Sequence, residues 1–75
     1  MPKLPRIGTR KIEQALRRAG FEEDRQKGGH LVLRHPESGR RAIVPQHAGT
    51  LPVGTVREII RQAGLTVEQF RDLLE

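Results

Sequence analysis

The pair Gly28–Gly29, followed at once by alternating polar and apolar residues, is the feature that most constrains this fold. Adjacent glycines permit the positive φ angles of a tight hairpin turn. The stretch that follows is typical of a strand that buries one face, with two leucines inward and His30, Val32 and Arg34 on the open side. The sequence therefore predicts a β-hairpin around these glycines, with a polar edge strand over residues 21–26.

A second turn and a return strand follow the hairpin. Pro36, Ser38 and Gly39 belong to the residue types that favour reverse turns. Residues 40–44 are then rich enough in apolar and β-branched types for a strand. Together the three segments predict an antiparallel meander with residues 30–35 as its middle strand.

Amphipathic helices are predicted before and after this meander along the chain. Apolar residues recur at helical spacing from Ile12 to Ala19, with Thr9 as the expected N-cap and Gly20 as the stop. A second stripe runs from Val56 to Ala63 behind a capping box at 55–58, and another capping box at 66–69 begins a short third helix. The residues between strand and second helix, 45–54, are predicted to be a loop.

These elements predict one α+β domain over residues 1–75, with residues 1–8 as an extended lead-in. A chain this short buries only about 60% of its unfolded surface, too little for two separate cores. The expected architecture is a three-stranded antiparallel sheet with helices on one face. The other face of the sheet is left open to a ligand.

The composition excludes several function classes. There is no cysteine, which rules out disulfides, thiolate catalysis and cysteine-based zinc sites. No apolar run approaches the roughly 20 residues of a membrane span, so we expect a soluble cytoplasmic protein. Without Trp or Tyr, stacking of bases on an aromatic platform is not the expected mode of recognition.

The net charge of +5 is concentrated in the first part of the chain. Residues 1–45 hold eleven Lys and Arg against five Asp and Glu, whereas residues 46–75 hold three against four. A basic surface of this kind attracts polyanions, nucleic acid first, because phosphate neutralisation releases counterions. The plain alternative is a soluble domain with a generic basic surface.

His30 is the main candidate for chemistry, because histidine alone has an unperturbed pKa near neutral pH. It could deprotonate the 2′-hydroxyl of a ribose, while Lys27, Arg34 and Arg41 steady the charge that develops on the phosphate. This route requires neither a metal nor a cofactor. Strand parity turns His35 to the opposite face, which argues against a shared metal site. The alternative for His30 is a polar residue that merely begins a strand.

Five segments stand in a fixed order along the chain: Gly20–Phe21, Lys27–His30, Arg34–Pro36, Val44–His47 and Gly54–Leu65. As an ordered set they resemble the HicA (YcfA-like) family of toxins from bacterial type II toxin–antitoxin systems. The resemblance implies a double-stranded-RNA-binding-domain-like α-β-β-β-α fold with a short extra helix, mRNA interferase activity, and inhibition by a HicB-type antitoxin. It places the catalytic histidine of the family's Gly-Ser-His motif on His30, with Gly29 in the position of the serine. His47 matches a Pro-x-His feature and is an auxiliary candidate.

The leading hypothesis is therefore a metal-independent endoribonuclease that is toxic when free and cleaves RNA with His30. The residues expected to contact RNA are Lys11, Lys27, Gly28, Gly29, Arg34 and Arg41. A non-catalytic RNA-binding module on the same scaffold is the second hypothesis. The third is an interaction protein whose basic face chiefly meets an acidic antitoxin, which would cover His30.

Overall fold

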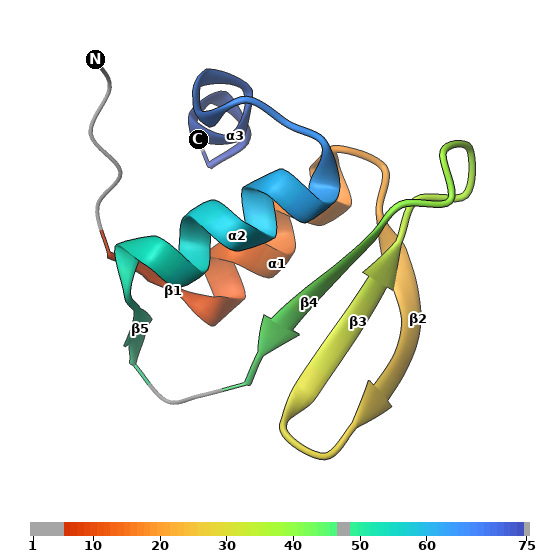
Figure 1. Ribbon diagram of the computed structural model, residues 1–75, viewed down its shortest axis with the longest axis horizontal. Helices are drawn as coiled ribbons and strands as arrows, with labels where there is room; N and C mark the ends of the chain where they lie inside the picture. Colours follow the sequence, from red (N-terminus) through yellow and green to blue (C-terminus); the bar gives the residue numbers. More distant parts are fainter. Residues whose placement is uncertain (1–5, 47–48, 75) are drawn as a thin grey trace.

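The computed structural model describes residues 6–46 and 49–74 of the chain. Three helices lie on one side of a three-stranded antiparallel sheet with strand order β2-β3-β4 (Figure 1). The elements in chain order are β1 (Ile7–Gly8), α1 (Thr9–Arg18), β2 (Glu22–Lys27), β3 (His30–Arg34), β4 (Arg41–Pro45), β5 (Thr50–Leu51), α2 (Val53–Ala63) and α3 (Val67–Leu73). The predicted α+β class and the α-β-β-β-α order with a C-terminal helix are confirmed.

The core lies between the sheet and the helices. Helices α1 and α2 both contact β4, and α3 packs against both of them. The apolar stripes predicted for the two longer helices supply most of the helical side, and the inward leucines of β3 are buried against them. The most completely buried large side chains are Phe70, Ile12, Leu16, Leu33, Leu51, Ile59, Val44 and Val56. Burial of these apolar groups is the main stabilising contribution to such a small domain.

The hairpin between β2 and β3 has a two-residue turn, Gly28–Gly29, as the sequence predicts. Of these two glycines, only Gly28 has a positive φ, 58°, which is the pattern of a type II′ turn. Strand β2 begins one residue later than predicted, because the Phe21 side chain is buried and its backbone N–H donates to the Leu16 carbonyl oxygen at the end of α1. A register shift between Glu23 and Arg25 marks a β-bulge that the sequence did not reveal.

Two of the predicted helix starts are wrong. The N-cap of α1 is Gly8 rather than Thr9, and α2 begins at Val53, behind Pro52, instead of at a capping box on Thr55. Because Thr55 already lies inside the helix, Glu58 is free to pair with Arg61 on the next turn. The capping box of α3 is confirmed: the N–H of Gln69 donates to Thr66 Oγ1 at 3.0 Å and its side chain accepts from the Thr66 N–H at 2.8 Å.

A second, two-stranded sheet lies within segments predicted as lead-in and loop. Strand β1 pairs antiparallel with β5, and the buried pair Ile7 and Leu51 faces the core. Strands of two residues carry no periodicity, so the sequence pattern could not show them. This pairing places the first turn of α1 beside the chain that enters α2 (Figure 1).

Candidate active site

His30 lies on the open face of the sheet, defined here as the face turned away from the helices. In β3 the side chains at positions 31 and 33 are buried, while His30 and Arg34 are exposed. The hairpin sets Lys27 directly opposite His30, so both side chains share the open face. On the other side of β3, Pro45 is the partner of His30, and the Gln46 N–H donates to the Gly29 carbonyl oxygen at 2.6 Å. The turn that carries His30 is thus fixed to both neighbouring strands.

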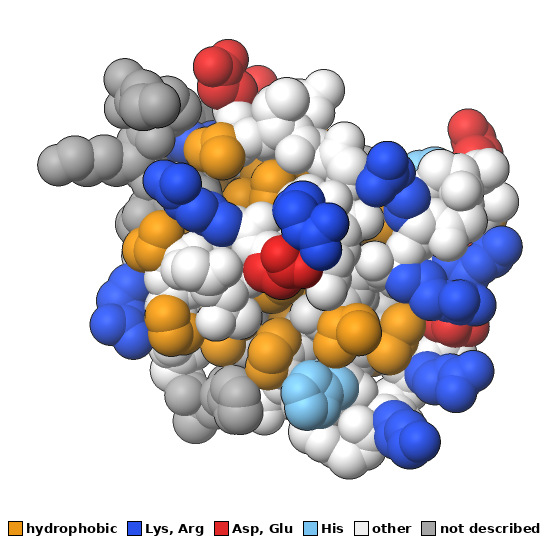
Figure 2. All heavy atoms as spheres, viewed as in Figure 1, with side chains coloured by type: hydrophobic (Ala, Val, Ile, Leu, Met, Phe, Trp, Pro, Cys, Tyr) orange, Lys and Arg blue, Asp and Glu red, His pale blue; other side chains and the backbone are white. Residues whose placement is uncertain are grey.

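A shallow hollow of about 580 Å³ occupies this part of the open face, and we call it the sheet hollow. Its centre is apolar, since Val32 of β3 is paired with Ile43 of β4, which is 42% exposed. Polar and charged groups from the three strands surround that centre, and Figure 2 shows a group of Lys and Arg side chains along the edge of the molecule where β2 lies. The residues that line the sheet hollow are Asp24, Arg25, Lys27, His30, Val32, Arg41 and Ile43.

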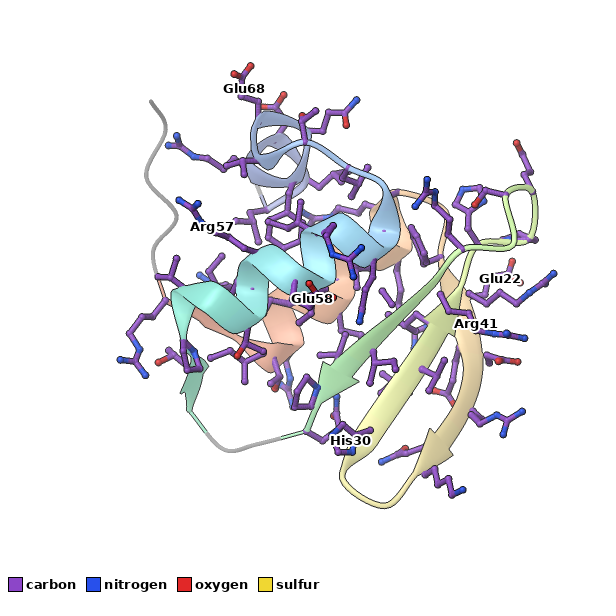
Figure 3. All side chains as sticks on the ribbon, viewed as in Figure 1. Glu22, His30, Arg41, Arg57, Glu58 and Glu68 are labelled. Carbon is purple, nitrogen blue, oxygen red and sulfur yellow. The ribbon has the colours of Figure 1, made fainter. Side chains whose placement is uncertain are left out.

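Positive charge prevails in the sheet hollow. Arg25, Lys27 and Arg41 line it against one carboxylate, that of Asp24. Asp24 Oδ2 lies 3.3 Å from Arg41 Nε, so this pair fixes one guanidinium at the side of the hollow. Figure 3 shows His30 beside the β2–β3 turn, and Arg41 toward the other end of the sheet. Such a ring of donors around an apolar floor fits an anionic ligand with a flat apolar part.

The structure brings only some of the predicted RNA-contacting residues to His30. Arg34 shares the open face but lies at the far end of β3, where it is paired with Arg41. Lys11 is on α1 and lines a different hollow, together with Arg6 and Arg10. His47 lies outside the described residues. Lys27 and Arg41 line the sheet hollow, and Gly28 and Gly29 form the turn that ends in His30.

Sequence reasoning missed four residues of the sheet hollow as site residues: Asp24, Arg25, Val32 and Ile43. The hairpin register would have found Arg25, because a residue two positions before Lys27 shares its face. Ile43 lies between Ala42 and Val44, which are both buried, so the alternation along β4 likewise turns Ile43 outward. Asp24 could not be placed in this way, since the bulge next to it breaks the parity of β2.

His35 lies in a structural environment, away from the sheet hollow. Its ring packs edge-on against Phe21, and its Nε2 is bonded to a backbone carbonyl oxygen. Among the residues that the structure describes, no three His, Cys, Asp or Glu side chains gather in a way that could hold a metal ion. In the same part of the chain, no helix has the length and apolar character needed to cross a membrane.

Comparison with family models matches residues 9–65 to the HicA toxin family of bacterial toxin–antitoxin systems. The chain belongs to the HicA toxin family. The match includes the whole of the β2-β3-β4 sheet and every residue of the sheet hollow. Membership makes this HicA toxin one half of a pair, with a cognate antitoxin as its protein partner. A search of curated proteins finds no match to the chain.

Proposed function

We propose that this HicA toxin is a metal-independent endoribonuclease that cleaves messenger RNA in the cytoplasm, with His30 as its proton-transfer group. The observation that carries the proposal is the position of His30 at the end of a basic hollow, opposite Lys27 and on the same face as Arg41. Family membership supports a toxic activity, and RNA is the polyanion that this charge and chemistry fit best.

The proposed reaction uses the 2′-hydroxyl of the RNA as the nucleophile. Neutral His30 accepts the proton of that hydroxyl, and the 2′-oxygen forms a bond to the adjacent phosphorus. The bond from phosphorus to the 5′-oxygen breaks, and this oxygen leaves with its electron pair and takes a proton from water. The products are a 2′,3′-cyclic phosphate and a 5′-hydroxyl end. Water has access to this step because His30 is exposed.

The cations of the sheet hollow would stabilise the transition state. Negative charge grows on the phosphate oxygens during the attack, and fixed positive groups lower the energy of that state more than that of the substrate. Arg25 and Lys27 have no carboxylate partner within the described residues, so they can turn to a phosphate. Arg41 is paired with Asp24, whose Oδ2 lies 3.3 Å from its Nε.

The apolar floor of the sheet hollow would bind the flat part of a nucleotide. Val32 and Ile43 offer an aliphatic surface on which a base or ribose can lie, without the stacking that an aromatic side chain would give. Contacts of this type distinguish poorly between bases. We therefore expect weak sequence preference from this hollow alone.

Inhibition by a HicB-type antitoxin would follow from covering the same face. The open face has no partner layer, and Ile43 is the one large apolar side chain that the described part of the chain leaves exposed. An acidic surface that packed on Ile43 and paired with the surrounding cations would close the approach to His30.

The decisive test compares wild type, His30→Ala and Gln26→Ala for RNA cleavage in vitro and for growth arrest on induction. Gln26 lies on the same hairpin but pairs with buried Leu31, so its substitution controls for damage to the hairpin. We expect cleavage and toxicity to be lost in His30→Ala only, with RNA binding retained and with activity unaffected by a chelator. Equal cleavage by His30→Ala and wild type would refute the role of His30.

A non-catalytic RNA-binding module is the second candidate. It is favoured because the described residues supply the sheet hollow with one histidine and one carboxylate, and that carboxylate, Asp24, is engaged with Arg41. Wild-type protein that binds RNA but leaves it intact would establish this alternative.

A further inference from the structure

A second hollow, of about 540 Å³, lies where β1, β5, the first turn of α1 and the end of α3 meet, and we call it the terminal hollow. Its residues are Arg6, Ile7, Gly8, Arg10, Lys11, Thr50 and Leu74. Figure 1 places β1 and β5 on the opposite side of the molecule from β2, so the terminal hollow is separate from the sheet hollow.

Three cations line the terminal hollow, and none of the described residues that line it is acidic. Arg6, Arg10 and Lys11 are exposed, and within residues 6–46 and 49–74 none of them is paired with a carboxylate. Other helix arginines do have carboxylate partners: Arg17 pairs with Glu13 and Arg61 with Glu58. Like charges held together repel one another unless an anion neutralises them. The terminal hollow therefore concentrates positive charge that no carboxylate within residues 6–46 and 49–74 compensates.

The walls of the terminal hollow are built from ordered backbone. The pairing of Ile7 with Leu51 and of Gly8 with Thr50 fixes the strand that leads into α1. Buried Ile7 anchors that strand to the core, so the neighbouring Arg6 begins from a fixed point. Arg10 and Lys11 follow within the first turn of the helix. The three cations thus line one hollow from the residue that precedes β1 and from the first turn of α1, rather than being spread along a solvated helix face.

A phosphate group is the ligand that fits this arrangement. Guanidinium groups bind phosphate oxygens through two parallel hydrogen bonds, and an ammonium adds a further charged donor. We infer that the terminal hollow is a second phosphate-binding site, which holds backbone phosphates of an RNA segment remote from the cleaved bond. This inference rests on the proposed function for the choice of RNA as the source of the phosphate.

The consequence is a dependence of affinity on RNA length. A short oligonucleotide can fill the sheet hollow alone, whereas a longer strand can run round the protein and reach the terminal hollow as well. The second contact shares one chain with the first, so it raises affinity through effective concentration. Cleavage of short RNA should not require it.

The test measures RNA affinity in the full chain carrying His30→Ala, so that no substrate is consumed. Arg10→Glu is compared with Arg57→Glu, an exposed arginine of α2 that lines neither hollow and gives the same change in net charge. Each variant is titrated with single-stranded RNA of about 4 and about 20 nucleotides at several salt concentrations.

We expect Arg10→Glu to weaken binding of the long RNA about tenfold and to reduce its salt slope by about 1, with little change for the short RNA. Arg57→Glu should have a clearly smaller effect on the long RNA. Equal losses of affinity for the long RNA in the two variants would overturn the inference, because they would reflect only the change in net charge. Weaker binding of the antitoxin with unchanged RNA affinity would also overturn it and assign the terminal hollow to the protein partner.

The outcome can be separated from that of the proposed function. Arg10→Glu with His30 intact should still cleave short RNA at the wild-type rate. If no form of the protein cleaved RNA but Arg10→Glu alone lost affinity for the long strand, the proposed endoribonuclease would fail and the second phosphate site would stand.

Discussion

The Nε2 atom of His35 lies 3.2 Å from the carbonyl oxygen of Ala19, and this contact joins the turn after β3 to the end of α1. Because a carbonyl oxygen only accepts, Nε2 is the donor, and Nδ1 accepts from the N–H groups of Glu37 and Ser38 at 3.2 and 3.4 Å. The ring also meets Phe21 edge-on, with 5.2 Å between ring centroids. One neutral side chain thus satisfies three backbone groups.

Replacement of His35 by alanine should destabilise the protein without affecting the open face. Loss of these hydrogen bonds and of the ring contact is expected to cost about 1–3 kcal/mol. Urea unfolding followed by circular dichroism would measure this loss, with His30→Ala as the control, since the His30 side chain makes no such contact with any residue that the structure describes. Equal midpoints for the two variants would contradict the structural role of His35.

The two glycines of the hairpin turn should respond differently to substitution. Gly28 has a φ of 58°, whereas Gly29 has no positive φ, and a Cβ at either position would meet nothing within 4 Å. Gly28→Ser is therefore expected to cost about 1–2 kcal/mol through backbone strain, and Gly29→Ser close to nothing. Thermal unfolding of both variants would check this, and a larger loss in Gly29→Ser would refute the type II′ assignment.

A second pair of glycines offers an internal comparison in α2. Gly64 ends this helix with a φ of 74°, and a Cβ there would lie 2.6 Å from Arg40 Nε. Gly64→Ala should destabilise by about 1 kcal/mol or more, whereas Gly54→Ala, inside the helix and with open space around it, should stabilise by about 0.5–1 kcal/mol. Shifts of the unfolding midpoint in the same direction for both would contradict this explanation.

The ion pair of Glu58 and Arg61 gives a prediction for pH. The hydrogen bond from Arg61 lowers the pKa of Glu58 below its ordinary value of 4.5, so the pair favours the folded state above that pH and loses this contribution as the pH falls through the lowered value. Both groups are exposed, so the effect should be small. Glu58→Gln should lower the unfolding midpoint slightly at about pH 7, and this difference should shrink as the pH falls below 4.5. A difference that kept its full size at acid pH would refute the electrostatic origin.

Periodicity predicted those elements whose side chains alternate between core and solvent. The stripe from Ile12 to Leu16, the inward Leu31 and Leu33 and the outward His30 all follow from the requirement to bury apolar groups on one side. This requirement fixes the face on which the candidate site lies. It does not fix which residues of that face come together.

The remaining features of the fold and the candidate site depend on backbone pairing, which single residues do not reveal. The hydrogen bonds of β1 with β5 determine that α1 begins after Gly8 and that Lys11 turns to the terminal hollow. The bulge in β2 determines that Asp24 reaches Arg41. The first feature arises from contacts between segments that are distant in the sequence, and the second from the pairing of two neighbouring strands. Neither leaves a local pattern.

The ion pair between Asp24 and Arg41 should limit the affinity of the sheet hollow for RNA. Asp24 is the only carboxylate that the described residues contribute to the hollow. Its Oδ2 lies 3.3 Å from Arg41 Nε, so it competes with phosphate for that guanidinium. Asp24→Asn removes that negative charge and should strengthen RNA binding about threefold to tenfold at low salt, with the difference shrinking as salt rises. Cleavage should fall, because an Arg41 that is no longer oriented stabilises the transition state less well.

The matched control for this change is Glu22→Gln. Glu22 pairs with Arg34 in the same β2-β3 ladder but does not line the sheet hollow. Its substitution by glutamine removes the same negative charge as Asp24→Asn. Titration with a short RNA in the His30→Ala background measures affinity, and the same substitutions with His30 intact measure the rate of cleavage. Tighter binding of similar size in both variants would show that only net charge matters. Unchanged binding in Asp24→Asn would show that Arg41 does not meet the phosphate, and the sheet hollow would then bind RNA through Arg25 and Lys27 alone.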